Sequence, residues 1–319
     1  MTFWKRAFLG SLESDALAMP VHWYYDRQAL RRDYGTVDTF LSPRNPHSDS
    51  ILYRSKYSAP NAKGDILGEQ AKYWGQRGVH YHQFLEAGEN TVNFKLARIL
   101  YHDLKLHNSY DEDRWLTLYI DTMLHPERHR DTYLEEYHRA FFLNYAKGKD
   151  PRQCGISDEH IGGLAMVPAL LAGLEESGAE EKRRIVHRHI QLTHRHDGVL
   201  HAADTLTRIL IKMEEGQSLP EAISKEIDSW VQFSKLESLL EKDDHDVIGP
   251  HFSPACYIKE SFPASIYLAL KYHDDYQAGL IANAMVGGDN CHRGAVVGAL
   301  LGAENKSQGC FGDLKEPLD

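Results

Sequence analysis

Apolar residues recur at helical spacing along most of the chain. The clearest stripe lies between Thr91 and Leu106 and consists of Val92, Leu96, Ile99, Leu100 and Leu104. Similar stripes occupy Leu164 to Leu174, Ile185 to Thr193, Leu206 to Met213, and Ile266 to Tyr272. Residues spaced in this way share one face of a helix. We therefore predict a helix in each of these segments.

Strand signals are weak by comparison. The sequence shows no sustained alternation of apolar and polar residues between paired turns, and fragments such as Ile51 to Tyr57 are too few to build a sheet. The pattern therefore predicts an all-α fold. The stretch from Asp26 to Gln76 is rich in Pro, Ser, Gly and aromatic residues, so we expect a long irregular segment of the kind that often carries binding or lid loops.

Two segments near the ends of the sequence are rich in small residues. One begins at Phe3 and is ended by Pro20, and the other begins at about Asp289. The second repeats glycine every four residues, at Gly294, Gly298 and Gly302. Each glycine inside a helix costs about 1 kcal/mol relative to alanine, and close approach of another helix would offset that cost. We predict that these two helices pack together at the centre of the fold.

Charge and composition narrow the functional classes. Lys and Arg number 36 against 46 Asp and Glu, and a net charge of -10 argues against a protein that binds nucleic acid by neutralising phosphates. No apolar run reaches the roughly 18 residues of a membrane span, and Glu13 and Asp15 interrupt the first apolar segment, unlike a secretory signal. The 4 cysteines are too scattered for a disulfide framework. We expect a cytoplasmic protein that binds neither nucleic acid nor membrane.

Candidate chemistry gathers at the start of the C-terminal helix. Gly287 and Gly288 allow a sharp turn, which would present Asp289, Cys291 and His292 around a helix N-terminus. Backbone N–H groups and the helix dipole favour anions there. The pattern indicates a phosphate or metal site.

A second polar segment, Gly88 to Thr91, directly precedes the stripe that begins at Val92. Taken alone it is more typical of an N-cap, because Asn and Thr accept hydrogen bonds from exposed N–H groups and Glu suits the positive end of a helix. The alternative is that Glu89 and Asn90 belong to a site.

In order and spacing, these segments resemble the ADP-ribosylglycohydrolase family. The family's opening helix motif is matched by Gly10 to His22, its Thr-Asp-Asp-Thr metal motif by Gly88 to Thr91, and its central element by Gly162 to Leu170. Its closing G-G-D-x-D motif is matched within Ala282 to Ala303. The resemblance covers essentially the whole chain. It implies one compact orthogonal helical bundle over residues 1–319 and a hydrolase that cleaves a ribosyl glycosidic bond.

The family's metal ligands are largely replaced in this chain. In the family, oxygen ligands from these motifs hold two Mg²⁺ ions, whereas the matching positions here are His22, Gly88, Glu89, Asn90, Asp289, Cys291 and His292. Of these only Asp289 keeps the family's residue. Mg²⁺ requires several hard oxygens in octahedral array, so we expect the magnesium pair to be lost.

The replacements themselves suggest two alternatives. If the family fold holds, one cleft receives five ligand-type residues, His22, Glu89, Asp289, Cys291 and His292. Histidine, carboxylate and thiolate suit Zn²⁺ or Fe. Without a metal, Glu89 would act as general acid or base and Asp289 would stabilise a ribosyl cation. Cys291 could instead be a nucleophile, since helix N-termini lower the pKa of a thiol. Three residues, Gly287, Gly288 and Asn90, would then contact the bound ligand.

The expected substrate is an ADP-ribosylated protein or a related ADP-ribosyl or nucleotide-like molecule. The alternative function is that of a catalytically silent, crystallin-like protein that keeps the fold and binds an ADP-ribose-like ligand. In either case Glu89 and Asp289 are the residues we expect to matter most.

The sequence has 19 histidines, and most receive alternative interpretations. Cleft residues or solvated helix ends are the alternatives for His194, His196 and Asp197. The segment His80 to His82 could line the cleft. Charged helix surfaces are expected for His125, His129 and His138. The cleft or the core is expected for Tyr133, Glu136 and Tyr137.

Overall fold

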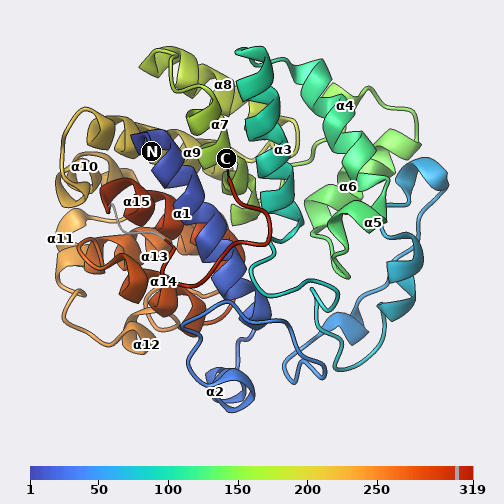
Figure 1. Ribbon diagram of the computed structural model, residues 1–319, viewed down its shortest axis with the longest axis horizontal. Coiled ribbons are helices and arrows are strands. Elements are labelled where there is room, and N and C mark those ends of the chain that lie inside the picture. Colours follow the sequence, from blue (N-terminus) through green and yellow to red (C-terminus); the bar gives the residue numbers. More distant parts are fainter. Residues whose placement is uncertain (306–308, 319) are drawn as a thin grey trace.

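The computed structural model describes residues 1–305 and 309–318 and consists of helices joined by turns and loops (Figure 1). The α-helices are α1 (Phe3–Ala18), α2 (Arg27–Tyr34), α3 (Val92–His107), α4 (Glu112–Met123), α5 (Pro126–His129), α6 (Glu136–Ala146), α7 (Val167–Gly173), α8 (Ala179–Gln191), α9 (Asp197–Glu214), α10 (Leu219–Glu226), α11 (Phe233–Glu237), α12 (Asp244–Val247), α13 (Ile258–Lys271), α14 (Tyr276–Met285) and α15 (Asn290–Glu304). Within the described residues, β pairing is limited to isolated bridges. The predicted all-α fold is confirmed.

The predicted helices lie where the apolar stripes placed them. The stripe from Thr91 to Leu106 is α3, and the later stripes lie within α8, α9 and α13. The segment Leu164 to Leu174 is divided between the 3-10 helix η6 (Ile161–Met166) and α7. Pro168 stands in the first turn of α7, where its missing N–H costs nothing, and this explains why the α-helix begins there.

Helices α1 and α15 form the central pair of the fold, and α13, α14, α3 and α7 surround them (Figure 1). A Cβ atom on Gly10 would lie 2.1 Å from the carbonyl oxygen of Gly298, and one on Gly298 would lie 2.2 Å from the carbonyl oxygen of Gly10. Gly294 faces Ser14 in the same way, since a Cβ atom on Gly294 would lie 2.6 Å from the Oγ of Ser14. Gly298 is buried. The predicted packing of the two small-residue helices is therefore confirmed.

The irregular stretch contains one helix that the apolar pattern did not predict. Asp26 accepts hydrogen bonds from the backbone N–H groups of Gln28 and Ala29 and so caps α2. This helix has only 8 residues and buries Ala29, Leu30 and Tyr34, too few for a visible stripe. The remainder of the stretch contains the short 3-10 helices η2 (Leu52–Arg54), η3 (Ala62–Gly64) and η4 (Gly68–Tyr73).

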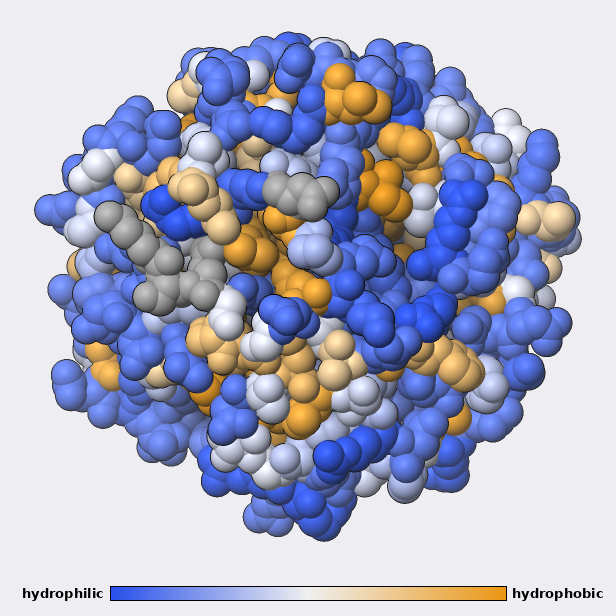
Figure 2. All heavy atoms as spheres, in the orientation of Figure 1, coloured by the Kyte–Doolittle hydropathy of each residue, from blue (hydrophilic) through white to orange (hydrophobic). Residues whose placement is uncertain are grey.

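The surface agrees with the acidic, polar composition. Figure 2 shows one face of the molecule, on which hydrophilic residues cover most of the area and hydrophobic ones are exposed in smaller groups. In the described part of the chain, no helix combines the length and the apolar character needed to cross a membrane.

Candidate functional site

One pocket lies directly above the start of α15. It has a volume of about 340 Å³. Four loops form its walls: the loop after α1 and the loops that come before α6, η6 and α13. The segment between α2 and α3 adds Ile51, Ser55 and Tyr81. The remaining lining residues are Trp23, Tyr25, Tyr133, Glu135, Glu136, Asp158, His160, Cys256 and Tyr257. Aromatic and acidic side chains therefore dominate this pocket.

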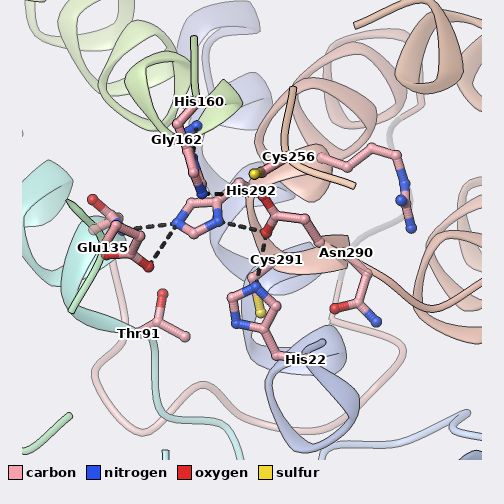
Figure 3. A network of polar contacts seen from close by, with 12 residues as sticks. His22, Thr91, Glu135, His160, Gly162, Cys256, Asn290, Cys291 and His292 are labelled. Carbon is pink, nitrogen blue, oxygen red and sulfur yellow. Dashed lines mark hydrogen bonds and ion pairs between the residues drawn. The ribbon is translucent and has the colours of Figure 1, made fainter. Parts of the chain in front are cut away.

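Three buried charged groups lie together beside the pocket, and of these Glu135 lines it. His292 Nδ1 lies 2.6 Å from Asp289 Oδ1, and His292 Nε2 lies 3.3 Å from Glu135 Oε1. Figure 3 shows the His292 ring beside Glu135. Asp289 is the N-cap residue of α15 and Glu135 is the N-cap residue of α6. Each carboxylate therefore lies at the positive end of a helix dipole.

The protonation states of these groups depend on one another. Burial alone would lower the pKa of His292, but Asp289 and Glu135 hold it well above its usual value. Burial would likewise raise the pKa values of both carboxyls, yet His292 keeps the pKa of Asp289 and of Glu135 well below the ordinary range. At neutral pH the cluster is an imidazolium between two carboxylates.

A chain of buried contacts leads away from this cluster. His22 Nε2 lies 2.8 Å from Asp289 Oδ1, and His22 Nδ1 lies 2.7 Å from His82 Nε2. His82 Nδ1 then contacts Asp131, which also accepts a 2.7 Å hydrogen bond from the Val92 N–H. Asp131, from the α5–α6 connection, therefore caps the first turn of α3.

These contacts need one proton more than the two imidazoles supply. Three contacts in series join Asp131, His82, His22 and Asp289, and two neutral imidazoles carry two ring protons. Burial raises the pKa of Asp131 to about 7, although Lys95 and His129 oppose that shift. The Asp131 carboxyl can therefore hold the third proton near neutral pH.

The aromatic wall is rigid. Trp23 stacks on His22 with ring centroids 3.8 Å apart, and it meets Tyr81 and Tyr133 edge to face at 4.7 and 4.9 Å. Tyr133 is in turn stacked on Trp74, whose Nε1 donates to the Thr132 carbonyl oxygen. Trp23 adopts a φ of 62°, a left-handed conformation that a bulky side chain rarely adopts. The surrounding contacts hold this strained residue at the pocket.

A larger hollow of about 820 Å³ lies between α8 and α9, but it is a weaker candidate. It is lined mainly by charged side chains that already pair with one another, such as Arg183 with Asp204 and Arg184 with Glu181. It lies apart from the buried cluster.

The structure brings together His22, Asp289 and His292 among the residues expected from the sequence, but it places Glu89 elsewhere. Glu89 Oε1 lies 2.6 Å from Lys95 Nζ, and Oε2 pairs with Arg130. These partners keep the pKa of Glu89 low in spite of its burial. The second carboxylate of the site is Glu135, which contacts the same His292 ring as Asp289 does.

Cys291 and Asn90 contact the opening helix. Cys291 Sγ lies 3.7 Å from the Asp15 carbonyl oxygen, and burial raises the pKa of its thiol well above the usual value. The expectation of a lowered thiol pKa at this helix start is therefore wrong, because desolvation outweighs the dipole. Asn90 Nδ2 donates to the Leu12 carbonyl oxygen and to Asp15. Both residues connect α1 to its neighbours.

The Gly287–Gly288 turn is held by protein contacts. Both glycines have positive φ values, near 70°, and a Cβ on either would lie within 2.3 Å of a carbonyl oxygen, that of Tyr24 or of Pro254. The N–H of Gly288 donates to Tyr24 and that of Asp289 to Pro254. These glycines permit the close packing that positions Asp289.

Glu135, His160, Cys256 and Asp131 escaped the sequence analysis. His160 lies just before the matched segment Gly162 to Leu170, at the start of η6, and Cys256 lies just before α13. Position before a matched helix was the available signal. Glu135 and Asp131 had none, because neither is part of a matched motif.

Nine of the 19 histidines are buried. His129 and His138 are buried, so their expected place on charged helix surfaces is wrong. His194 is also buried and packs 4.2 Å from the Tyr137 ring, whereas His196 caps α9. Tyr137 is buried in the core, while Tyr133 and Glu136 line the pocket, as does Tyr81 from the His80 to His82 segment.

Comparison with known proteins identifies the family. The family model described as ADP-ribosylglycohydrolase matches residues 4–310. The chain belongs to the ADP-ribosylglycohydrolase family. It is 24% identical over 313 residues to Crystallin J1A of Tripedalia cystophora, covering 95% of this chain and 88% of that protein. It also shares the fold of an ADP-ribosylglycohydrolase-related protein complex, with a TM-score of 0.54 and 16% identity over 95% of this chain and 89% of the other. The family is generally hydrolytic, so the chain is of ADP-ribosylglycohydrolase type.

The described residues do not fit the two Mg²⁺ ions that the family implies. Both oxygens of Asp15 already accept hydrogen bonds from Asn90 and Thr91, and both oxygens of Glu89 are paired with cations. Asp289 Oδ1 meets two imidazoles. Too few oxygens are left for octahedral coordination.

A softer ion meets a different obstacle. Among the described residues, two groups of potential ligands have atoms within 4.8 Å of one another: His22, Asp289 and His292, and His160, Cys256 and Asp289. The first group is closed by its own hydrogen bonds. In the second, the Gly162 N–H donates to His160 Nδ1, so the ring proton belongs on Nε2, which faces Asp289 Oδ2 at 3.5 Å. Zn²⁺ or Fe bound at Nε2 would move the ring proton to Nδ1 and so break the hydrogen bond from the Gly162 N–H.

Proposed function

We propose that the protein hydrolyses a ribosyl glycosidic bond in an ADP-ribosylated protein or a related ADP-ribosyl or nucleotide-like substrate. The observation that carries the proposal is the position of two ionised carboxylates at a pocket walled by aromatic rings. Glu135 lines the pocket, and Asp289 lies behind it, 3.5 Å from the lining residue His160. Aromatic rings can stack on a base, and carboxylates stabilise the positive charge that develops at ribosyl C1.

Within this proposal the two carboxylates have different parts. Glu135 lines the pocket and is ionised, so its carboxylate can accept a hydrogen bond from the attacking water and orient it. Asp289 is fixed by His22 and His292 and acts as a fixed negative charge. His292 positions both groups. Glu89 stabilises the start of α3 through its ion pairs.

Turnover tests this proposal directly. The protein would be incubated with ADP-ribosyl-arginine, ADP-ribosyl-serine and simple nucleosides. We expect release of the ribosyl product from at least one of them, with a loss of about 10²- to 10³-fold in kcat/KM for Glu135→Gln and for Asp289→Asn. Glu241→Gln, at an exposed position, is the matched control.

The second candidate function is a crystallin-like binding protein. The similarity to Crystallin J1A favours it, as does the poor fit to the family's metals. Tight binding of ADP-ribose with no turnover of any substrate would support this candidate and contradict the hydrolase.

A further inference from the structure

The charge of the pocket is unusual for a site that receives phosphate. Its lining includes Glu135, Glu136 and Asp158 but neither Lys nor Arg. The one basic group of the lining, His160, has a pKa lowered by burial and is therefore neutral at pH 7. A phosphate-bearing group would meet carboxylates on several sides of this pocket.

The nearby helix N-termini do not reverse this preference. The dipoles of α6 and α15 would favour an anion, but Glu135 and Asp289 already stand at these ends as N-cap residues. Both are buried, and one oxygen of each, Glu135 Oε2 and Asp289 Oδ2, has no hydrogen-bond partner. The protein's own carboxylates occupy the positions that an anion would need.

The walls suit a flat ligand. Trp23 and Tyr81 are buried in the wall, and Tyr25 and Tyr257 stand at the mouth with 46% and 53% of their surface exposed. Cations bind favourably over the faces of such rings. A volume of about 340 Å³ is at the small end of the range for ligand sites and suits one ring system with its sugar.

The leaving group fits the same preference. A pyridinium leaves as a neutral pyridine, so its departure needs no proton from the lining.

We propose that this pocket binds a planar aromatic cation and that its preferred substrate is an N-ribosylpyridinium. The proposal rests on the proposed function for the site and for the ribosyl bond, and it replaces the ADP-ribosyl group by a nucleoside-like cation without phosphate. In the reaction, the water oxygen bonds to C1 and the C1–N bond breaks, with its electron pair going to the ring nitrogen. The pyridinium becomes a neutral pyridine, and the proton of the water passes through Glu135 to solvent.

Binding of a matched pair of probes tests the charge preference without turnover. 1-Methylnicotinamide is a cation and nicotinamide is its neutral counterpart of similar shape. Quenching of tryptophan fluorescence and equilibrium dialysis would give both affinities. We expect the cation to bind at least tenfold more tightly at low salt, with the preference falling as salt is added.

Variants then assign the preference to this pocket. Glu136→Gln and Asp158→Asn remove charge while keeping shape, and each should reduce the preference severalfold, the double variant nearly abolishing it. Glu127→Gln, at an exposed position outside the pocket, should leave it unchanged. Circular dichroism would confirm that each variant is folded. Equal affinity for both probes, no binding of the cation, or tighter binding of ADP-ribose than of the cation would overturn the proposal.

Turnover separates this proposal from the broader one. Nicotinamide riboside should be hydrolysed and the neutral nucleoside inosine should not. Cation preference without hydrolysis of any substrate would keep the binding inference and reject the hydrolase. Hydrolysis of inosine or of ADP-ribosyl-serine at a rate above that of nicotinamide riboside would keep the hydrolase and reject the substrate class.

Discussion

Three of the buried histidines of this protein share one arrangement. In His47, His80 and His129, Nδ1 accepts a backbone N–H two residues ahead, and Nε2 meets the carbonyl oxygen of a residue distant in sequence. This pattern fixes a neutral ring with its proton on Nε2. Each ring therefore connects two backbone segments without carrying charge. The large histidine content is in good part a set of such internal connectors.

Asp131 is the residue at which this neutral network meets a charged one. Its folded-state pKa, about 7, lies above the ordinary value of a carboxyl because of burial. A raised carboxyl pKa contributes stability that is fully present below about pH 4 and lost as the pH rises through about 7. We therefore expect the free energy of unfolding attributable to Asp131 to fall across that window.

The variant Asp131→Asn should remove this dependence. An asparagine can accept from the Val92 N–H and donate to His82 Nδ1, as the protonated carboxyl does. Urea unfolding of both proteins from about pH 5 to 8 should show the variant gaining on the wild type by up to roughly 3 kcal/mol as pH rises. Asp131→Ala leaves both partners unsatisfied and should cost about 2–4 kcal/mol near pH 5, with the cost shrinking as pH rises and the wild type loses stability. A constant difference between wild type and Asp131→Asn would contradict the assignment of the extra proton.

At the scale of elements, the contact between α1 and α15 decides where the site lies. Gly10 and Gly298 let the two backbones touch, and α15, which contains Gly298, begins after the N-cap residue Asp289. Any increase in the separation of the helices would move Asp289 relative to His22, which follows α1. The glycines that pack the core therefore also set the geometry of the cluster.

Gly298→Ala tests this coupling. Helix propensity favours alanine by about 1 kcal/mol, but the new Cβ would lie 2.2 Å from the Gly10 carbonyl oxygen, which is backbone and cannot turn aside. We expect a net loss of at least about 2 kcal/mol in thermal unfolding. The control is Gly178→Ala, since a Cβ there meets nothing within 4 Å. Unchanged or increased stability of Gly298→Ala would show that the helices are not in this contact.

At the scale of the whole molecule, the first and last helices of the fold are packed together at its centre. Helix α1 cannot bury its surface until α15 is in place, and α13 and α14 pack on α15 in turn. A ligand that binds the cluster therefore binds the point where most elements meet, and it should stabilise the molecule as a unit.

Thermal melts in the presence of metal ions would detect such stabilisation. We expect millimolar Mg²⁺ to leave the Tm nearly unchanged, because too few of the described oxygens at the site are free for octahedral coordination, whereas 100-fold saturation of a site would add about 2.7 kcal/mol. A large rise that disappears in Asp289→Ala would mean that the magnesium site is intact. Stoichiometric Zn or Fe in protein purified without chelator, lost in His160→Gln or His292→Ala, would favour the softer ion.

A single cooperative unfolding transition is expected if residues 1–319 form one domain.

The sequence alone determined the helical class, the positions of α3, α8, α9 and α13, and the pairing of the two small-residue helices. These follow from local periodicity and from the cost of glycine in a helix, which neighbouring residues set. Asp289 and His292 were identified for the same reason, since both lie in the first turn of one helix.

Only the tertiary structure decided which residues join them. Glu135 reaches His292 from a different helix start, and Asp131 reaches Val92 across a separation of 39 residues. Glu89 forms ion pairs with Lys95 and Arg130 and does not reach the site, and no local sequence pattern indicates these two pairings. Partner choice between buried charges depends on three-dimensional proximity and desolvation, and neither is encoded in local spacing.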